Sequence, residues 1–135
     1  MNGGRSPLHY AALANDVVRM SALLARGADP SAADEKDFTP LHFAAQERAI
    51  EAAELLLKNG ARVDAVNVYG NTPLMEAVSR SRGEGQLIQL LRSRGADPFH
   101  RNRSGQTPVG LARLIANYDV ARFFADLPGG ESDPP

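Results

Sequence analysis

The chain has 135 residues, of which 43% are hydrophobic and 23% are charged, and its formal net charge at pH 7 is -1. These values are typical of one soluble domain, and so balanced a charge gives no overall electrostatic reason to expect a nucleic acid or an anionic membrane as partner. The chain has no cysteine, which excludes disulfides and thiolate metal sites, and no run of about 18 apolar residues that could span a bilayer.

Composition also bears on compartment and origin. The N-terminal segment from Met1 to Pro7 is rich in glycine and lacks the apolar stretch of a secretory signal, so we expect a cytoplasmic protein. Of the 15 basic residues, only Lys36 and Lys58 are lysine. We interpret this arginine bias as a sign of GC-rich coding and of a bacterial source.

The first predicted element begins at a motif, SPLHYAA in residues 6–12, that returns along the chain. Its serine or threonine suits a helix N-cap, because the hydroxyl accepts from the free N–H groups of the first turn. The proline that follows suits the first helical position, where no donor is needed. Each copy therefore predicts the start of a helix. The later copies are TPLHFAA in residues 39–45, TPLMEAV in residues 72–78 and the weaker TPVGLA in residues 107–112.

A second helix is predicted after each of the first three motifs, because apolar residues follow at helical spacing and a glycine then ends the run. Gly27 and Gly60 lie 20 residues after the motif proline, whereas Gly95 lies 22 residues after Pro73. The excess falls between Pro73 and Gly95, most readily in residues 81–85. We expect that segment to be the most mobile internal loop.

The motif prolines reveal an internal repeat. Pro7, Pro40, Pro73 and Pro108 are separated by 33, 33 and 35 residues. One such unit cannot bury its apolar faces alone, whereas stacked neighbours can. The sequence therefore predicts an all-α solenoid of about four helix-turn-helix units joined by extended, hairpin-like loops.

These motifs resemble the ankyrin repeat family, whose 33-residue unit carries a T-P-L-H-x-A signature. The resemblance covers roughly residues 4–127. It implies one domain over residues 1–127, with repeats at about residues 1–33, 34–66, 67–101 and 102–127. The fourth repeat has Gly110 at the histidine position and Arg113 at the second alanine position of the motif, which fits a C-terminal cap with a solvent-exposed outer face. Residues 128–135 cannot bury apolar area and are expected to form a disordered tail.

The turn between the two helices of a repeat departs from the family pattern, which usually has glycine there. Asn15 takes the place in the first repeat and tolerates left-handed backbone. Arg48 takes it in the second repeat, at a cost of about 1 kcal/mol if its backbone is left-handed.

His9 and His42 are the obvious candidates for a catalytic or metal role, but their equivalent positions argue for a structural one. Stacked helices lie about 8–10 Å apart, too far for both imidazoles to bind one zinc ion at about 2 Å each. We expect each to hydrogen-bond to loop backbone and join repeats, and His100 to be solvent-exposed or packed in its loop. No phosphate-binding, serine-hydrolase or zinc-protease motif occurs. We therefore expect no catalytic residue, no cofactor and no metal.

Charge is uneven along the chain. Residues 29–64 hold eight acidic and four basic residues, whereas residues 79–113 hold seven arginines and two acidic residues. The arginine-rich half is ordinary solvated surface, a contact for a protein partner or, least favoured, a nucleic-acid contact. The last is disfavoured because neither interleaved aromatic residues nor a reading helix accompanies the arginines.

The family resemblance implies a concave binding surface made of loop tips and first helices. Phe38 and Tyr69 stand out there, because a polar loop tip has no structural need for a ring and exposed aromatics anchor interfaces. The alternative is that these rings fold back onto the adjacent repeat. The positions that match the surface are Arg5, Glu35, Lys36, Phe38, Val68, Tyr69, Asn71, Arg103, Ser104 and Gln106 in the tips, and Gln46, Glu47, Ser79 and Arg80 near the ends of first helices.

Three classes of function remain open. The leading one is a protein-protein interaction module, monomeric when free, of which a bacterial immunity or inhibitor protein that neutralises a cognate toxin or enzyme is a narrower version. The second is a structural homo-oligomer, for which Tyr10 and Val18 could supply an apolar outer face. The third, an enzyme, is disfavoured by the missing motifs.

Overall fold

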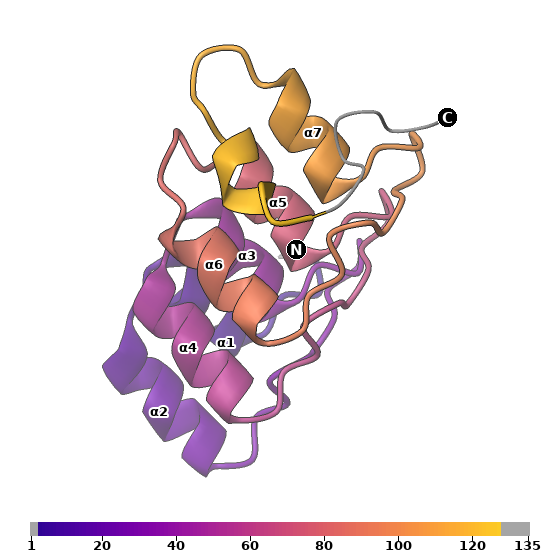
Figure 1. Cartoon of the computed structure of the whole chain (residues 1–135). Coiled ribbons are helices and arrows are strands. Elements are labelled where there is room, and N and C mark those ends of the chain that lie inside the picture. Colours follow the sequence, from indigo (N-terminus) through magenta and orange to yellow (C-terminus); the bar gives the residue numbers. More distant parts are fainter. Residues whose placement is uncertain (1–2, 128–135) are drawn as a thin grey trace.

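The computed structural model describes residues 3–127, and within that range it contains helices and loops but no strand. The expected tail, residues 128–135, lies outside the described residues. Four of the helices, α1, α3, α5 and α7, form one row, and α2, α4 and α6 form a second row alongside it (Figure 1). The loops that join successive units project together to one side (Figure 1). The all-α solenoid is thus confirmed.

The helices follow the predicted pairing. The first helices of the units are α1 (Pro7–Leu13), α3 (Pro40–Gln46), α5 (Pro73–Ser79) and α7 (Pro108–Leu114). The second helices are α2 (Val17–Ala25), α4 (Ile50–Lys58) and α6 (Gln86–Ser93), and the fourth unit ends in a short 3-10 helix, η1 (Ala121–Phe124). No helix within residues 3–127 has the length and apolar character needed to cross a bilayer.

Local chemistry explains where the first helices begin. Each starts at a proline, and the threonine hydroxyl before α3, α5 and α7 caps the first turn. Thr39 accepts from the N–H of His42 at 3.3 Å, and Thr107 accepts from that of Gly110 at 2.9 Å. The second helices α2, α4 and α6 are each followed, one residue past the C-cap, by a glycine with φ between 90° and 94°. The predicted helix starts and glycine stops are therefore confirmed.

The core lies between the two rows of helices. Paired small residues such as Ala44 and Ala45 keep the first helices thin, and they are fully buried. Larger side chains from both rows, among them Leu41, Leu56 and Ile88, fill the space between neighbouring units and are also fully buried. Because each unit covers the next, stability depends on the interfaces between repeats.

The fourth unit differs from the predicted helix pair. After α7 the backbone becomes extended at Ile115 (φ -73°, ψ 117°), and the second helix is reduced to the four residues of η1. The segment is held by two fully buried side chains, Val120 and Phe124, rather than by a long amphipathic helix. No fifth unit covers this end within residues 3–127, so a second helix there would have only one side to bury.

The insertion at residues 81–85 lies in the loop between α5 and α6, as predicted, but it is packed rather than free. Ser81 is 1% exposed, and Arg122 donates to the carbonyl of Gly83 at 3.2 Å. A side chain at Gly85 would overlap the ring of Phe123. The extra residues of the third repeat therefore form part of the surface against which the fourth unit packs.

Candidate functional site

The loop tips are built by one acidic or amide residue at the base of each hairpin. Asp34, Asn67 and Asn102 are equivalent, and each uses Oδ1 to accept two backbone N–H groups across its own tip. The N–H groups of Lys36 and Phe38 lie 2.9 Å from Asp34 Oδ1. Repetition of this turn gives the second, third and fourth tips the same shape.

Backbone hydrogen bonds join successive tips into one continuous edge. The N–H of Val68 donates to the carbonyl of Lys36 at 2.9 Å, and the N–H of Arg103 donates to that of Tyr69 at 3.0 Å. Glu35 makes the equivalent bond to Gly3 at 2.7 Å. Tip residues that are far apart in sequence therefore lie side by side, and we call the tips together with the adjoining first helices the loop-tip surface.

Two histidines fix the tips to the first helices. The N–H of Ser6 donates to Nδ1 of His9 at 2.9 Å, so Nε2 carries the proton and donates to the carbonyl of Phe38 at 2.8 Å. His42 repeats the arrangement, with its Nε2 lying 2.9 Å from the carbonyl of Asn71. Burial lowers the pKa of His42 to about 4, which keeps it neutral near pH 7. The predicted structural role of both residues is confirmed.

The structure also shows the position of His100 and bears on metal binding. His100 is half-buried in its loop, with Nε2 at 3.1 Å from the carbonyl of Gly70, as the loop-packing alternative predicted. Within the described part of the chain no three His, Cys, Asp or Glu side chains are grouped closely enough to hold a metal ion. The imidazoles thus act as links between repeats.

Aromatic side chains gather where the first three units meet the loop tips. The rings of Phe38 and Phe43 are stacked, with centroids 5.4 Å apart and planes at 10°. Tyr69 packs edge-on against Phe38 at 6.2 Å, and the guanidinium of Arg5 lies 4.6 Å from the centroid of Phe43. We call Arg5, Phe38, Phe43 and Tyr69 the aromatic cluster.

The two rings singled out in the sequence lie in different environments, and Phe38 does not fold back onto the adjacent repeat as the alternative proposed, whereas Tyr69 contacts Phe38 of the adjacent repeat and yet stays exposed. Phe38 is half-buried and folds back onto its own repeat, against Phe43 and His42. Tyr69 is 52% exposed and forms the open edge of the aromatic cluster. Sequence reasoning missed Phe43, which occupies the variable position of the T-P-L-H-x-A motif and is 4% exposed. The sequence did contain a signal for this residue: a large ring occupies the variable motif position, where the third unit has Glu76 instead.

A buried carboxylate extends this surface towards the fourth unit and was also missed. Glu76 is 7% exposed and accepts from the side-chain amides of Gln46 at 3.3 Å and of Asn67 and Asn71 at 3.4 Å. Asn71 in turn accepts from Asn102 at 2.8 Å. Gln46 and Asn71 were both expected to contact a partner. The amide N–H of Gln46 instead donates to the next repeat, and Asn71 uses both ends of its amide, donating to Glu76 of its own repeat and accepting from Asn102 of the next.

The remaining expected contact residues fall into two groups. Glu35, Lys36 and Arg103 are exposed at the tips, with Val68 and Gln106 half-buried beside them. Glu47, Ser79 and Arg80 are exposed at the other end of the first helices, away from the tips. The structure thus brings the tip residues together along one edge and sets the helix-end residues apart.

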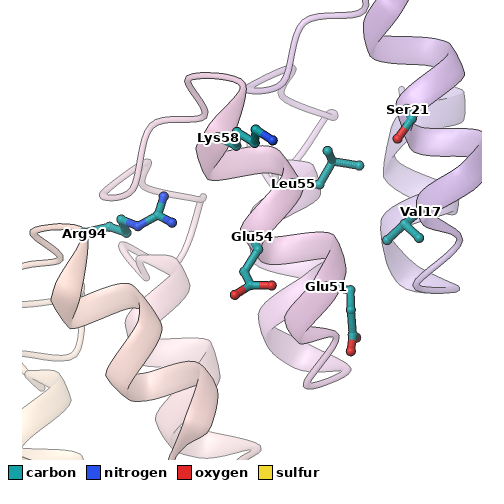
Figure 2. Close-up of a pocket in the computed structure, with 7 residues that line it drawn as sticks. All are labelled: Val17, Ser21, Glu51, Glu54, Leu55, Lys58 and Arg94. Atoms are coloured by element: carbon teal, nitrogen blue, oxygen red, sulfur yellow. The ribbon is translucent and has the colours of Figure 1, made fainter.

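A shallow hollow on the opposite side of the molecule offers no comparable cluster. The residues that line it come from α2, α4 and the end of α6, and they are spread along the second row of helices (Figure 2). One of its carboxylates, Glu51, accepts from the side chain of Asn15 at 3.0 Å, and this bond lowers the pKa of Glu51. This hollow belongs to the outer face. It is lined by Val17, Ser21, Glu51, Glu54, Leu55, Lys58 and Arg94.

Comparison with known proteins agrees with the repeat geometry. A family model described as ankyrin repeats, in three copies, matches residues 8–102, which is more than half of the chain. No curated protein sequence matches the chain.

Proposed function

Because the chain belongs to the ankyrin repeat family, whose repeats generally serve as protein-protein interaction modules, we propose that it binds a protein partner through its loop-tip surface. On this proposal the tips and the first helices form a concave face that grips the partner. The residues expected to contact it are those already placed along the tips, with Tyr69 at their centre.

The observation that carries this proposal is the exposed ring of Tyr69. It stands at a loop tip with 52% of its surface accessible, yet it is held from behind by Phe38. A rigid, half-exposed tyrosine on a fixed backbone loses little conformational freedom on binding, and tyrosine and arginine are enriched among the residues that dominate interface energies. A standard interface buries about 800 Å² on each partner, and the joined tips offer a continuous surface for it.

Isolation of the partner tests the proposal. The full chain is used as bait in an affinity purification followed by mass spectrometry, beside two variants. Tyr69→Ala removes the exposed ring of the aromatic cluster. Tyr118→Ala is the matched control, because it removes a ring of similar exposure, 45%, beside the turn between α5 and α6.

On this proposal, the wild-type and Tyr118→Ala baits retain the partner, whereas the Tyr69→Ala bait recovers much less of it. Equal recovery with all three baits would show that the loop-tip surface is not the binding face.

A narrower form of the proposal is that the partner is a toxin or enzyme that this chain inhibits, as an immunity protein in a bacterial cytoplasm. The arginine bias and the compact repeat unit support it. A toxin-like gene beside the coding gene would strengthen it, and the absence of one would weaken it. The structural homo-oligomer has less support, since Val18, 80% exposed, and Tyr10, 38% exposed, lie on different helices, α2 and α1.

We also propose that residues 1–127 act as a single domain, monomeric when free, that catalyses no reaction and uses neither cofactor nor metal. Light scattering across a concentration series checks the oligomeric state.

A further inference from the structure

A basic hollow lies where α3 and α5 end, on the side of the first helices away from the loop tips. It has a volume of about 390 Å³ and is open to solvent. Three arginines surround it, together with two polar side chains and one carboxylate. The lining residues are Gln46, Glu47, Arg48, Ser79, Arg80 and Arg82.

Arg48 is committed to contacts within the chain. Its Nη1 donates to the carbonyl of Arg80 at 3.0 Å, and its Nε lies 3.4 Å from Oε1 of Glu84. These contacts hold the side chain of Arg48 in place, and Glu84 neutralises one of the three positive charges of the basic hollow.

Arg80 and Arg82 are exposed, and neither guanidinium has a hydrogen bond or ion pair with any of residues 3–127. Glu47 is the one carboxylate of the lining. The lining therefore holds one carboxylate and two arginines that have no partner in the described part of the chain, so the basic hollow carries net positive charge.

The backbone at Arg82 gives a second reason to look for a ligand. Asn15, Arg48 and Arg82 occupy the turns between helices in successive repeats, with φ of 54°, 53° and 52°. Left-handed backbone is unfavourable for residues other than glycine. Asn15 and Arg48 use the position to reach the next repeat. Arg82 has the same backbone but makes no such contact within the described residues.

We propose that the basic hollow binds an acidic segment of the protein partner, with Asp or Glu side chains received by Arg80 and Arg82. Arginine pairs with carboxylate through two parallel hydrogen bonds. The nearby Glu47 would repel a doubly charged phosphate more than a single carboxylate. The Oε1 of Gln46 remains free to accept a peptide N–H, because its Nε2 donates to Glu76. The inference rests on the proposed function, since it adds a charged anchor to the same protein partner.

A hexaglutamate peptide tests the inference without knowledge of the partner. Its binding to the full chain is measured by calorimetry at low salt, for the wild type and for Arg80→Gln/Arg82→Gln. The matched control is Arg19→Gln/Arg26→Gln, which removes two exposed arginines of α2 and its C-cap. Circular dichroism confirms that both variants fold.

The inference expects the wild type and the control to bind alike and Arg80→Gln/Arg82→Gln to bind at least about fivefold more weakly, since exposed charge pairs make modest individual contributions. Three outcomes would overturn it: no binding by the wild type, equal weakening in both variants, or tighter binding of inorganic triphosphate or of a DNA duplex than of the peptide.

Tyr69→Ala separates this inference from the proposed function. The variant should bind hexaglutamate as the wild type does, because Tyr69 lies at the tips and not in the basic hollow. If partner capture depends on Tyr69 but the wild type does not bind hexaglutamate, only the inference about the basic hollow fails. If the wild type binds hexaglutamate through Arg80 and Arg82 but partner capture does not depend on Tyr69, only the loop-tip proposal fails.

Discussion

Asn15 caps a helix of the neighbouring repeat: its Oδ1 accepts the backbone N–H of Ala52, in the first turn of α4, at 3.0 Å. The residue before that helix, Ala49, has no side chain able to cap it. Asn15 also donates to Glu51 at 3.0 Å. Its place in the turn, where the family usually has glycine, is therefore explained by a contact that glycine cannot make.

The capping contact predicts the effect of two substitutions. Asn15→Ala should lower the free energy of unfolding by about 2 kcal/mol, because it removes a cap and replaces asparagine, which tolerates left-handed backbone, with alanine, which does not, at φ 54°. Asn15→Gly should lower it by less, since glycine relieves the backbone. Urea denaturation measures both. Greater stability of Asn15→Gly than of the wild type would show that the cap contributes nothing.

Much of this architecture could be predicted because it is local. The Ser-Pro or Thr-Pro pairs that begin helices, the glycines that end helices and the histidines that link repeats recur at fixed offsets, so each copy of the motif supports the others. Phe43 and Glu76 were missed because they occupy the one variable position of the motif, where the neighbouring repeat decides what fits. The 3-10 helix of the fourth unit was also missed, because its packing depends on an insertion more than 30 residues earlier, at residues 81–85.

Acid should destabilise the fold through His42. Burial lowers the pKa of this side chain to about 4 in the folded chain from its ordinary value of 6.5. The unfolded chain therefore binds more protons between these values, so stability rises as pH increases from about 4 to about 6.5 and is then level. The full change is on the order of 3 kcal/mol.

His42→Met is the matched test, because the equivalent residue of the third repeat is Met75. The variant should show a flatter dependence of unfolding free energy on pH in this window, measured by urea denaturation followed by circular dichroism. An unchanged slope would assign the acid sensitivity to other groups.

Gly85→Ala should detach the fourth unit from the third. The added methyl group would overlap the ring of Phe123, although the backbone at Gly85 suits any residue, with φ of -101°. We expect a loss of about 1–3 kcal/mol, as for other overpacked sites. The double variant Gly85→Ala/Phe123→Ala provides the check. Its two effects should be clearly non-additive, and simple additivity would mean that the two residues do not meet.

Phe38 and Tyr69 should differ in their effect on stability. Phe38→Ala removes a half-buried ring stacked on Phe43 and should cost about 2 kcal/mol. Tyr69→Ala removes a ring that is 52% exposed and should cost less than about 1 kcal/mol. Thermal unfolding measures both. If Tyr69→Ala proved the more damaging, Tyr69 would be a packing residue rather than a binding anchor.

Hydrogen exchange on the complex with the isolated partner tests the central claim most directly. Binding through the loop-tip surface should slow exchange at amides in residues 34–38 and 67–71 while leaving those of α2 and α4 unchanged. Protection confined to α2 and α4, around the outer hollow of Figure 2, with none at the tips, would contradict the account.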